Sequence, residues 1–513
     1  MYIEPNSNII ICKSVPLDNT YENTVYFDSP LSQESYFSSK QKYNLTNYSY
    51  QRVEKGKLRA EIKADNLYDC NYMMFKNSNF GNKWFYAFIT SVEYVNNVTS
   101  EISFEIDVMQ TYFFDTTLLE SLVLREHSST DVAGENIQPE SVELGEYFFT
   151  DYKRIAYDPE VVIGLPTVVI VYVADNEAQL TEHTYDGVFS GLTLFAFDIS
   201  NSEEYLALHN FLAKYSGTPE EIVMMYMCPS GIVSYNQSTH IVIPESSGNT
   251  YTLPLKNSIV GMDFDGYIPK NKKLYTFPYS FYNIDNGNES IVLRNEFFSS
   301  DSTPKVEIIS SYVSPVELKL RPVAYKGSNI NSGSSLPLPL RCESLSISGF
   351  PMCAWSNDSF SRWAVQGGMK AIGDMVIDAA TFNATGFFGE FVGGVKQGLS
   401  AMRLPDIPRG KLTVNADFSH NMMSFNESIG RITGEYCEVI DNYFSKYGYA
   451  TNKLKIPNRN VRPSWTYCKT LGCNMVANAP TTAIAKMKSI YDNGITFWKS
   501  NKIVGDYSQE NEV

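Results

Sequence analysis

Hydrophobic and polar residues alternate along the first 125 residues, which predicts a region of β-strands. In the stretch SEISFEIDV, the hydrophobic positions are separated by polar ones: Ile102, Phe104, Ile106 and Val108 alternate with Ser103, Glu105 and Asp107. That period of two is typical of a strand with one buried and one solvated face. The preceding run, KWFYAFITSVEYV, is joined to it through Asn96 and Asn97, so we expect a hairpin. Two shorter runs, NIIICKSV and NTVYFDS, are expected to add strands.

The pattern becomes more mixed between residues 126 and 345. The run VVIGLPTVVIVYVAD is rich in β-branched residues and predicts a buried strand. The stretch SEEYLALHNFLAKYSG predicts a helix that begins at Ser202, carries Glu in its first turn and ends near Gly217, followed by a strand. The Asn286-Gly287 pair is expected at the tip of a hairpin within FPYSFYNIDNGNESIVLRNEFF.

Near the C-terminus, apolar residues recur at helical spacing and predict a helix that ends at Gly448. The residues that set this spacing are Ile429, Ile432, Tyr436, Val439, Ile440 and Tyr443. The final stretch, YDNGITFW, indicates an Asn-Gly turn between short strands. A C-terminal piece of this kind is expected to pack beside the N-terminal strands and close one discontinuous domain.

These patterns predict a mainly β protein with some α, divided into several domains. The chain has 513 residues, of which 43% are hydrophobic, and its aromatic residues are mostly Tyr and Phe, which favours strands. We expect a discontinuous β-rich domain of residues 1–125 plus 410–513. An inserted β-rich (α+β) domain should cover 126–345, and a long apolar, Gly-rich helical loop should cover 346–409.

The net charge of −16 limits the partners that the chain can have. A protein that reads nucleic-acid sequence needs a basic face to neutralise phosphates, and the sequence has no cluster of Lys and Arg. An acidic surface has the opposite property, because it repels DNA and prevents it from adhering.

No catalytic motif is evident. The sequence lacks a Gly-rich phosphate loop ending in Lys-Ser/Thr, a helix with paired metal-binding histidines, and a Gly-x-Ser-x-Gly turn. The histidines are isolated, so each is expected at the surface or at the edge of a core: His127, His183, His209, His240 and His420. We therefore expect no cofactor, no metal site and no enzymatic activity.

One cysteine pattern loosely evokes amidases that cut peptidoglycan. Cys353 is followed by Ala354 and Trp355, and His420 lies further along, so a thiol and its base are both present. The segment between them is rich in Gly and apolar residues and lacks the alternating strands that would hold such a pair together. Pairs of carboxylates for glycoside hydrolysis remain available, although availability alone is no evidence for them.

Cysteine usage and the N-terminus favour a chain that is made in a cytoplasm and is soluble there. Cys468 and Cys473 are too far apart for the usual metal pair, so we expect reduced core or interface residues. The N-terminal MYIEPNSNIIICKSVPLD has no basic region and only a short apolar run, which is unlike a secretory signal. No stretch reaches about 18 consecutive apolar residues, so no single membrane-spanning helix is expected.

The stretch between Trp363 and Met402 differs from the rest of the chain. Its charged residues are only Lys370, Asp374, Asp378, Glu390 and Lys396. Its first part has apolar residues at helical spacing and predicts an amphipathic helix: Ala364, Val365, Met369, Ile372, Met375, Val376 and Ala379. Phenylalanines separated by glycines follow. Two readings remain open, a helical hairpin packed in a core and a segment stored for insertion into lipid.

Glycine content favours the second reading. Each glycine inside a helix costs about 1 kcal/mol relative to Ala, so a static helical core would rarely concentrate them. Glycines also leave the backbone free to change conformation. The positions expected to give this freedom are Gly367, Gly368, Gly373, Gly386, Gly389, Gly393, Gly394 and Gly398.

Several runs at both ends of the chain resemble the tail-knob, or distal tail-tube, proteins of small short-tailed phages that infect Gram-positive bacteria. These runs are LYDCNYMMFKNSNFGNKWFYAFITSVEYVNN, SFEIDVMQTYFFD, LVLREHSSTDVAGENIQPE, YFSKYGYATNKLKIPNRNVRPSWTYCKT and YDNGITFW. The resemblance covers most of the chain and is more specific than any catalytic motif above.

The resemblance implies a subunit of a hexameric, β-rich ring or tube at the tip of a virion tail. It implies contacts with other tail proteins and passage of phage DNA through the lumen without sequence-specific binding. It also implies that the loop plugs the lumen before ejection and then opens the host membrane. The side chains expected to meet lipid are Trp363, Met369, Ile372, Met375, Val376, Phe382, Phe387, Phe388, Phe391, Val392 and Leu399.

Two alternatives stay open at the level of sequence. A receptor-binding tail protein would use Tyr- and Asn-rich loops to contact cell-wall polysaccharide, and saccharide binding by the isolated protein would support it. A tail-associated cell-wall hydrolase would require Cys353, and activity that disappears with Cys353→Ala would support it.

Overall fold

A computed structural model describes most of the chain. The described residues are 6–48, 56–155, 168–174, 184–185, 188–189, 192–215, 218, 221–228, 233–243, 250–285, 289–298, 303–311, 317–326, 345–346, 352–356 and 425–513.

The chain forms two compact units. Unit 1 comprises residues 1–145, 263–274 and 434–513, and unit 2 comprises 146–262 and 275–433. The N-terminal and C-terminal parts therefore lie in the same unit, together with a short segment from the middle of the chain, residues 263–274. The boundaries differ from those expected from sequence, since 126–145 and 263–274 lie in unit 1. The separate loop domain stays a prediction, because most of 346–409 lies outside the described residues.

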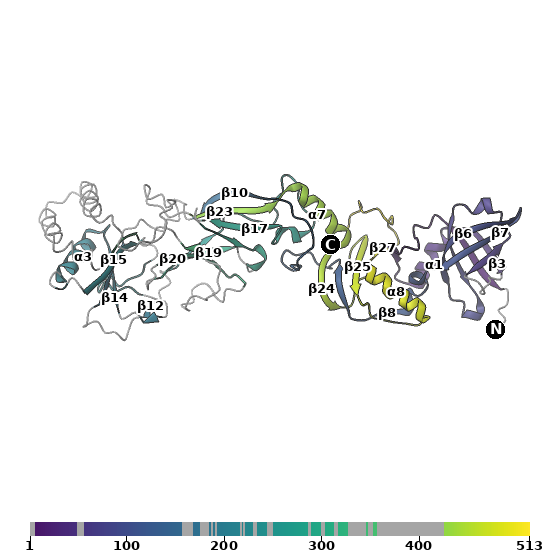
Figure 1. The fold of residues 1–513 in the computed structure, drawn as a ribbon, viewed down its shortest axis with the longest axis horizontal. Helices are drawn as coiled ribbons and strands as arrows, with labels where there is room; N and C mark the ends of the chain where they lie inside the picture. The colour runs from purple at the N-terminus through teal and green to yellow at the C-terminus, as the bar shows by residue number, and fades with distance from the viewer. Residues whose placement is uncertain are drawn as a thin grey trace. The chain divides into compact units, whose positions relative to one another are not determined.

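Unit 1 begins with a six-stranded antiparallel sheet in the order β3-β1-β5-β6-β7-β4 (Figure 1). Its strands are β1 (Ser7–Lys13), β3 (Gln41–Tyr48), β4 (Lys57–Ala60), β5 (Cys70–Lys76), β6 (Phe85–Asn96) and β7 (Thr99–Ile106). Strand β1 is a continuous apolar run because both of its faces are covered. Ile9 and Ile11 pack in one core, and Ile10 and Cys12 pack in another.

The predicted hairpin of β6 and β7 is confirmed. Asn96 pairs with Thr99, and the Asn96 side chain accepts a hydrogen bond from the Val98 N–H at 2.9 Å. The strand ends two residues before the predicted end of the alternation, however, at Ile106 rather than Val108. Asp107 leaves the strand and caps a short helix, α2 (Val108–Thr111), by accepting from the N–H groups of Met109 and Gln110. The Asp107 carboxylate thus caps a helix at a position where the alternating pattern predicts a continued strand.

A second helix of unit 1 carries no strong periodic signal in the sequence. Helix α1 (Pro30–Ser38) begins after Ser29, whose side chain accepts from the Ser32 N–H while the Ser32 hydroxyl accepts from the Ser29 N–H. This reciprocal capping fixes the start of the helix. Phe37 then anchors it to the sheet, with its ring stacked on Tyr72 at 5.0 Å between centroids.

The C-terminal part of unit 1 contains a five-stranded sheet in the order β2-β27-β25-β9-β24 and a small ladder of β26 and β8. The strands are β2 (Asn23–Tyr26), β8 (Thr116–Leu118), β9 (Ser121–Glu126), β24 (Tyr449–Lys455), β25 (Trp465–Leu471), β26 (Met475–Ala477) and β27 (Ile495–Lys499). An N-terminal strand thus pairs with a C-terminal one, since β2 runs parallel to β27.

Two helices cover opposite faces of this sheet. Trp465 on β25 donates through its indole N–H to Ser445 of α7 (Gly434–Tyr447). Thr470 lies on the other face of β25 and donates to Asp492 of α8 (Thr481–Asn493). The sheet is therefore buried on both sides, with Trp465 and Trp498 among its largest fully buried side chains.

Two sequence predictions in this region need correction. Ile429 and Ile432 lie on a strand, and helix α7 begins only at Gly434. The predicted stop is close, since α7 ends at Tyr447 and Gly448 follows with a φ of 67°. The Asn-Gly pair near the C-terminus does not join two strands. Asn493 ends helix α8, and Gly494 adopts a φ of 98° that joins the helix to β27.

The described residues of unit 2 form three four-stranded sheets and a two-stranded one. The first has the order β10-β23-β17-β18, with β10 (Tyr147–Ile155), β23 (Phe425–Ile432), β17 (Ser280–Asp285) and β18 (Ser290–Leu293). The second has the order β14-β11-β15-β22, with β14 (Thr193–Asp198), β11 (Val168–Val173), β15 (Ile222–Cys228) and β22 (Met352–Ser356). The third has the order β16-β19-β20-β21, with β16 (Thr250–Pro254), β19 (Lys305–Ser311), β20 (Glu317–Val323) and β21 (Leu345–Ser346). The pair is β12 (Thr184–Tyr185) and β13 (Val188–Phe189).

Three predictions for this unit agree with the structure. Strand β11 is buried, β17 and β18 form an antiparallel hairpin, and α3 (Ser202–Lys214) is followed by β15. The hairpin tip, Asn286-Gly287, lies outside the described residues. The N-cap of α3 is Asn201 rather than Ser202, because the Asn201 side chain accepts from the Glu203 N–H. Short 3-10 turns complete the description at Ala64–Leu67, Ser78–Phe80, Phe113–Asp115, Lys272–Tyr275 and Asn295–Phe297.

Candidate functional site

The predicted membrane-active segment lies outside the described residues. All its apolar and glycine positions, from Trp363 to Leu399, fall between β22 and β23, where the structure describes nothing from 357 to 424. In the described part of the chain, no helix is long and apolar enough to cross a membrane. The roles of these residues therefore stay predictions.

The described cysteines are buried and reduced, as expected for Cys468 and Cys473. Burial raises the pKa of Cys12 to about 12 and that of Cys70 to about 11, so neither thiol is an activated nucleophile. Cys353 lies on β22, and its proposed partner His420 lies outside the described residues. Among described residues, no group of three or more His, Cys, Asp or Glu side chains could hold a metal ion.

His127 is buried, contrary to the expectation of a surface or core-edge position. Its Nδ1 accepts from the Tyr467 backbone N–H at 2.8 Å, and its Nε2 lies 3.1 Å from the Ser445 carbonyl oxygen. A carbonyl can only accept, so Nε2 carries the proton and the ring is neutral. Burial, with the positive charge of Arg462, lowers the pKa of His127 to about 3. The ring thus joins β9, α7 and β25 as a neutral bridge.

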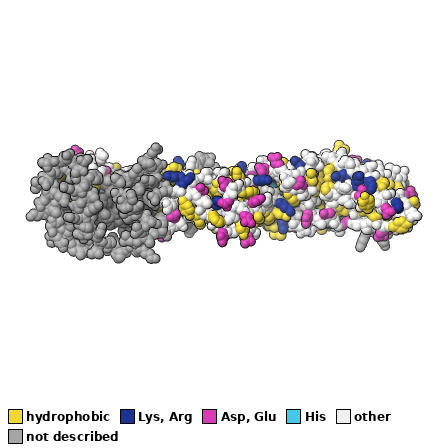
Figure 2. Space-filling view, turned by 90° about the horizontal axis from the view of Figure 1, so that it is seen from above, with side chains coloured by type: hydrophobic (Ala, Val, Ile, Leu, Met, Phe, Trp, Pro, Cys, Tyr) yellow, Lys and Arg dark blue, Asp and Glu magenta, His cyan; other side chains and the backbone are white. Residues whose placement is uncertain are grey.

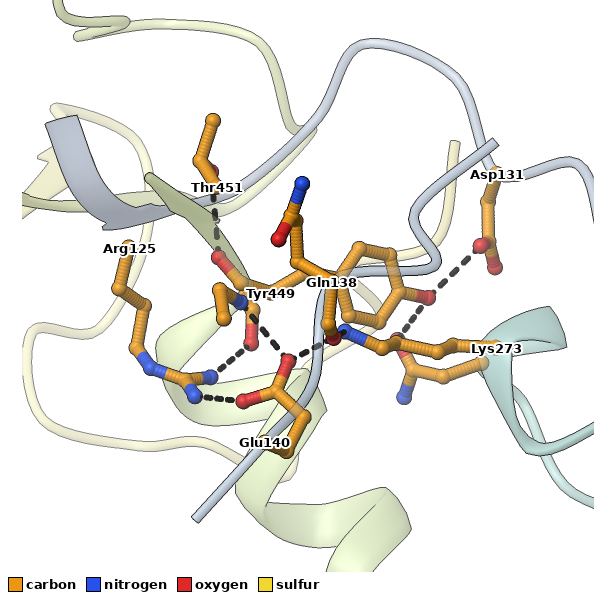
Figure 3. A network of polar contacts seen from close by, with 10 residues as sticks. Arg125, Asp131, Gln138, Glu140, Lys273, Tyr449 and Thr451 are labelled. Carbon is orange, nitrogen blue, oxygen red and sulfur yellow. Dashed lines mark hydrogen bonds and ion pairs between the residues drawn. The ribbon is translucent and has the colours of Figure 1, made fainter. Parts of the chain in front are cut away.

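A network of polar contacts in unit 1 surrounds Glu140, on a segment without helix or strand (Figure 3). The Glu140 side chain is fully buried and forms ion pairs with Arg125 and with Lys273, the latter at 2.5 Å. It also accepts from the Ala450 N–H at 2.8 Å, on the edge of β24. Burial lowers the pKa of Lys273, and the charge of Glu140 opposes that shift. We call Arg125, Glu140 and Lys273 the charged clasp.

A second set of hydrogen bonds lies beside the charged clasp (Figure 3). The Tyr449 hydroxyl donates to Asp131 at 2.7 Å and lies 3.1 Å from the Asn271 side-chain oxygen. Burial and the charge of Asp131 raise the pKa of Tyr449, so its hydroxyl stays protonated and able to donate. Asp131 and Asn271 come from the same two segments as Glu140 and Lys273.

Asp441 on α7 anchors the segment of residues 263–274 to unit 1. Its buried carboxylate accepts from the Tyr267 hydroxyl at 2.7 Å and from the backbone N–H groups of Lys270 and Asn271 at 2.9 Å each. The Asn271 side-chain amide also donates to it at 2.8 Å. Since donors meet both carboxylate oxygens, the geometry supports fastening of the chain rather than proton transfer.

Together these contacts hold segments 128–145 and 263–274 against β24 and α7. The carboxylates are matched by cations or N–H donors, and no substrate-sized group of unsatisfied polar atoms converges there among the described residues. This arrangement stabilises the fold where the chain leaves and re-enters unit 1.

Residues 246–403 and 410–512 match the family model described as the C-terminal domain of tail knob protein gp9 of Bacillus phage phi29. The chain belongs to this family of phage tail knob proteins. Residues 5–117 also match a model described as the N-terminus of caudoviral major tail proteins. The resemblance expected from the sequence is therefore confirmed.

Relatives of known name support the assignment over the full length. The chain is 25% identical to tail knob protein gp9 of Bacillus phage B103 and 24% identical to those of phages PZA and phi29. Each comparison covers 99% of this chain and 98% of the relative. The solved tail knob protein gp12 of bacteriophage C1 shares the fold, with a TM-score of 0.51 at 13% identity over 98% of this chain and 99% of that one.

The family settles the class of protein. This tail knob protein is a structural component of the phage tail in the virion, and its relatives are structural proteins rather than enzymes. The cell-wall hydrolase is therefore excluded as the main function. On the face shown in Figure 2, Lys and Arg side chains of described residues are interspersed with Asp and Glu, rather than gathered into one basic surface.

Sequence reasoning missed the charged clasp and the Asp441 anchor. Glu140 lies 15 residues from Arg125 and 133 from Lys273, and Asp441 lies 170 residues from Asn271. Residues so far apart in the sequence leave no local spacing pattern that would indicate their contact. The one available signal was SSTDVAGENIQPE, a polar run between a strand and an aromatic strand, which carries both Asp131 and Glu140 but resembles any exposed loop.

Proposed function

We propose that six copies of this tail knob protein form the distal tail tube through which phage DNA leaves the virion. The loop of residues 346–409 closes the lumen before ejection and is released to penetrate the host cell membrane. The protein contacts other tail proteins at the ends of the tube. DNA passes without sequence-specific binding.

The observation that carries this proposal is the composition of the segment from Trp363 to Met402 in a chain that matches tail knob proteins over its full length. The segment has few charges and many Phe, Met and Ile residues, so its transfer from water into an apolar environment is favourable. At about 25 cal/mol per Å² of apolar surface, several such side chains from six loops supply enough free energy to hold a segment in lipid. In a closed tube, the same side chains would bury one another.

The charge of the chain fits a passage for DNA. Each copy carries a net charge of −16, so a tube of six copies is strongly acidic. A wall that neutralises few phosphates releases few counterions and therefore binds DNA weakly. Electrostatic repulsion would keep the DNA from adhering as it slides.

Dye release from liposomes tests the membrane role of the loop. Purified protein at pH 7 and at mildly acidic pH is compared with a variant that lacks residues 358–401 and with the triple variant Phe387→Ser, Phe388→Ser and Phe391→Ser. We expect the parent to release dye and both loop variants to lose that activity.

A matched control replaces three exposed side chains of unit 1 by Ser: Leu31, Tyr68 and Ile503. This variant removes a similar amount of apolar surface outside the loop and should release dye like the parent. Circular dichroism confirms that each variant is folded. If the parent releases no dye under any condition that exposes the loop, or if the control loses activity as much as the loop variants, the membrane role is wrong.

A further inference from the structure

The first sheet of unit 2 has two edges that pair with no further strand in the described part of the chain. Strand β10 lies at one edge and β18 at the other, with β23 and β17 between them. All three pairings are antiparallel, so β10 and β18 run in opposite directions. An open edge presents unpaired N–H and C=O groups and attracts another strand.

The β10 edge is aromatic and exposed to solvent. Tyr147, Phe148 and Phe149 are 40%, 49% and 43% exposed. Proteins usually protect such an edge with charges or prolines, and residues 147–149 carry neither, since the charges of β10 begin only at Asp151. Apolar residues at an exposed edge are typical of an interface with another chain.

The strand register shows which side chains share a face. Phe149 pairs with Gly430, and Gly430 pairs with Phe281, so Phe149 and Phe281 lie on one face. The ring centroids of Phe149 and Phe281 lie 6.2 Å apart, and those of Tyr147 and Phe281 lie 5.6 Å apart. Gly430 permits this arrangement, because a Cβ there would lie 2.3 Å from the Phe281 ring.

The same face continues to the opposite edge of the sheet. Asn283, two residues after Phe281, pairs with Val292 on β18. Val292 therefore lies on the face of Tyr147 and Phe149, and it is 37% exposed. Each edge thus carries an exposed apolar side chain on the same face. The β18 edge of one copy can therefore pack these side chains against the β10 edge of a second copy.

Charges along the two edges are ordered for antiparallel pairing. Glu146 precedes β10, and Lys153 and Arg154 lie near its end. On β18 the order is similar, with Glu289 before the strand and Arg294 after it. When the strands run in opposite directions, the acidic start of each lies near the basic end of the other. A parallel pairing would bring like charges together, which is unfavourable.

We propose that β18 of one copy pairs antiparallel with β10 of the next copy, with Val292 packed against Phe149 and Tyr147. Copies related by rotation about a common axis keep the same strand direction, so this head-to-tail contact continues the antiparallel order without a flip. The same face of the sheet stays on the same side in every copy. The partner is a second copy of this chain, and the inference rests on the proposed tube.

Disulfide cross-linking tests the pairing. Cβ atoms of directly opposite residues in antiparallel strands lie about 4.5–5.5 Å apart, close to the separation that a disulfide requires. The double variant Phe149→Cys with Val292→Cys is oxidised under mild conditions and run on a non-reducing gel. We expect a ladder of covalent oligomers that reducing agent removes.

The matched control is Phe148→Cys with Val292→Cys, because Phe148 lies on the other face of β10. We expect little ladder from this variant. The described native cysteines are buried, and the parent oxidised alongside gives their background. Phe149→Cys alone should give only background, whereas a strong covalent dimer from it would indicate that β10 pairs with β10 and would overturn the proposal.

Native mass spectrometry of the same samples tests the proposed tube and the proposed edge pairing separately. A closed ring in the parent without a ladder from the Phe149 and Val292 double variant refutes the edge pairing and leaves the tube intact. A parent that remains monomeric at every concentration refutes both the tube and the edge pairing. A ladder in the double variant with none in the face control supports the pairing.

Discussion

The imidazole of His127 shows how one buried side chain can make the fold sensitive to acid. Both ring nitrogens are used, one by the Tyr467 N–H and the other by the Ser445 carbonyl. A second proton on Nδ1 would meet a donor instead of an acceptor, and burial of the ring disfavours the charged form. The ring is therefore required to stay neutral in the folded protein.

The pH dependence of stability follows from the direction of the shift. The pKa of His127 is about 3 in the folded protein and about 6.5 when the chain is unfolded, so the unfolded state binds the proton more readily. The stabilising effect is complete above pH 6.5 and is lost as pH falls towards 3. Between pH 6 and pH 4 the parent should lose about 2 kcal/mol more than His127→Gln.

Urea unfolding at several pH values, followed by tryptophan fluorescence, measures this difference. The comparison with His127→Gln removes the contributions of all other titrating groups, because both proteins share them. A difference between parent and variant that does not change from pH 7 to pH 4 would show that His127 is not buried as a neutral base.

At the scale of elements, the charged clasp fastens a segment that has no hydrogen-bonded ladder of its own. Glu140→Gln should destabilise unit 1 by about 3–5 kcal/mol, because it leaves Arg125 and Lys273 without a counter-charge in a buried site. Glu143→Gln is the control: Glu143 lies on the same segment but is exposed, so its loss should change stability by less than about 0.5 kcal/mol. Urea midpoints give both values.

Limited proteolysis adds a second readout for the charged clasp. Release of segment 128–145 should expose it to cleavage in Glu140→Gln and not in Glu143→Gln. Equal cleavage of the two variants would show that the ion pairs do not hold the segment.

Alanine substitutions at two glycines distinguish the stability cost of backbone strain from that of a steric clash. Gly448 and Gly472 both adopt a left-handed backbone, with φ of 67° and 69°. A Cβ at Gly448 would lie 2.1 Å from the Glu126 carbonyl oxygen, whereas one at Gly472 meets nothing within 4 Å. Gly472→Ala should cost about 1 kcal/mol, and Gly448→Ala should cost more by at least about 1 kcal/mol. Equal losses in thermal unfolding would contradict the close approach of α7 and β9.

Elements with a clear local period were predictable from the sequence, and those decided by distant partners were not. The hairpin of β6 and β7 has a strict alternation and an Asn-rich turn. Ile429 and Ile432, by contrast, are spaced by three residues, which suits a helix. They lie instead on β23, because that strand is paired on both sides, and Ile429 and Ile432 are buried there.

The candidate site was even less accessible to sequence reasoning. The loop is recognisable because its composition is unusual over many consecutive residues. Glu140 is one acidic residue among many, and its role depends on Arg125 and Lys273, which reach it only after folding. Likewise, Asp107 continues the alternation of β7 in the sequence, but its side chain finds the N–H groups of α2 and ends the strand.

At the scale of the whole molecule, the chain combines N-terminal and C-terminal strands in one unit and inserts a second unit between them. The matches to the relatives span 98% of the relatives' own length. The open edges of β10 and β18 suggest how such chains associate. In the proposed ring, these edges would join neighbouring copies.

The most direct test of this account is the structure of the purified assembly, by native mass spectrometry and electron cryo-microscopy. The account predicts a closed ring with six times the mass of the 57.9 kDa chain, six-fold symmetry and an axial lumen with density from the loop at one end. A particle with any other closed symmetry, an open filament, or a ring whose lumen contains no loop density would contradict it.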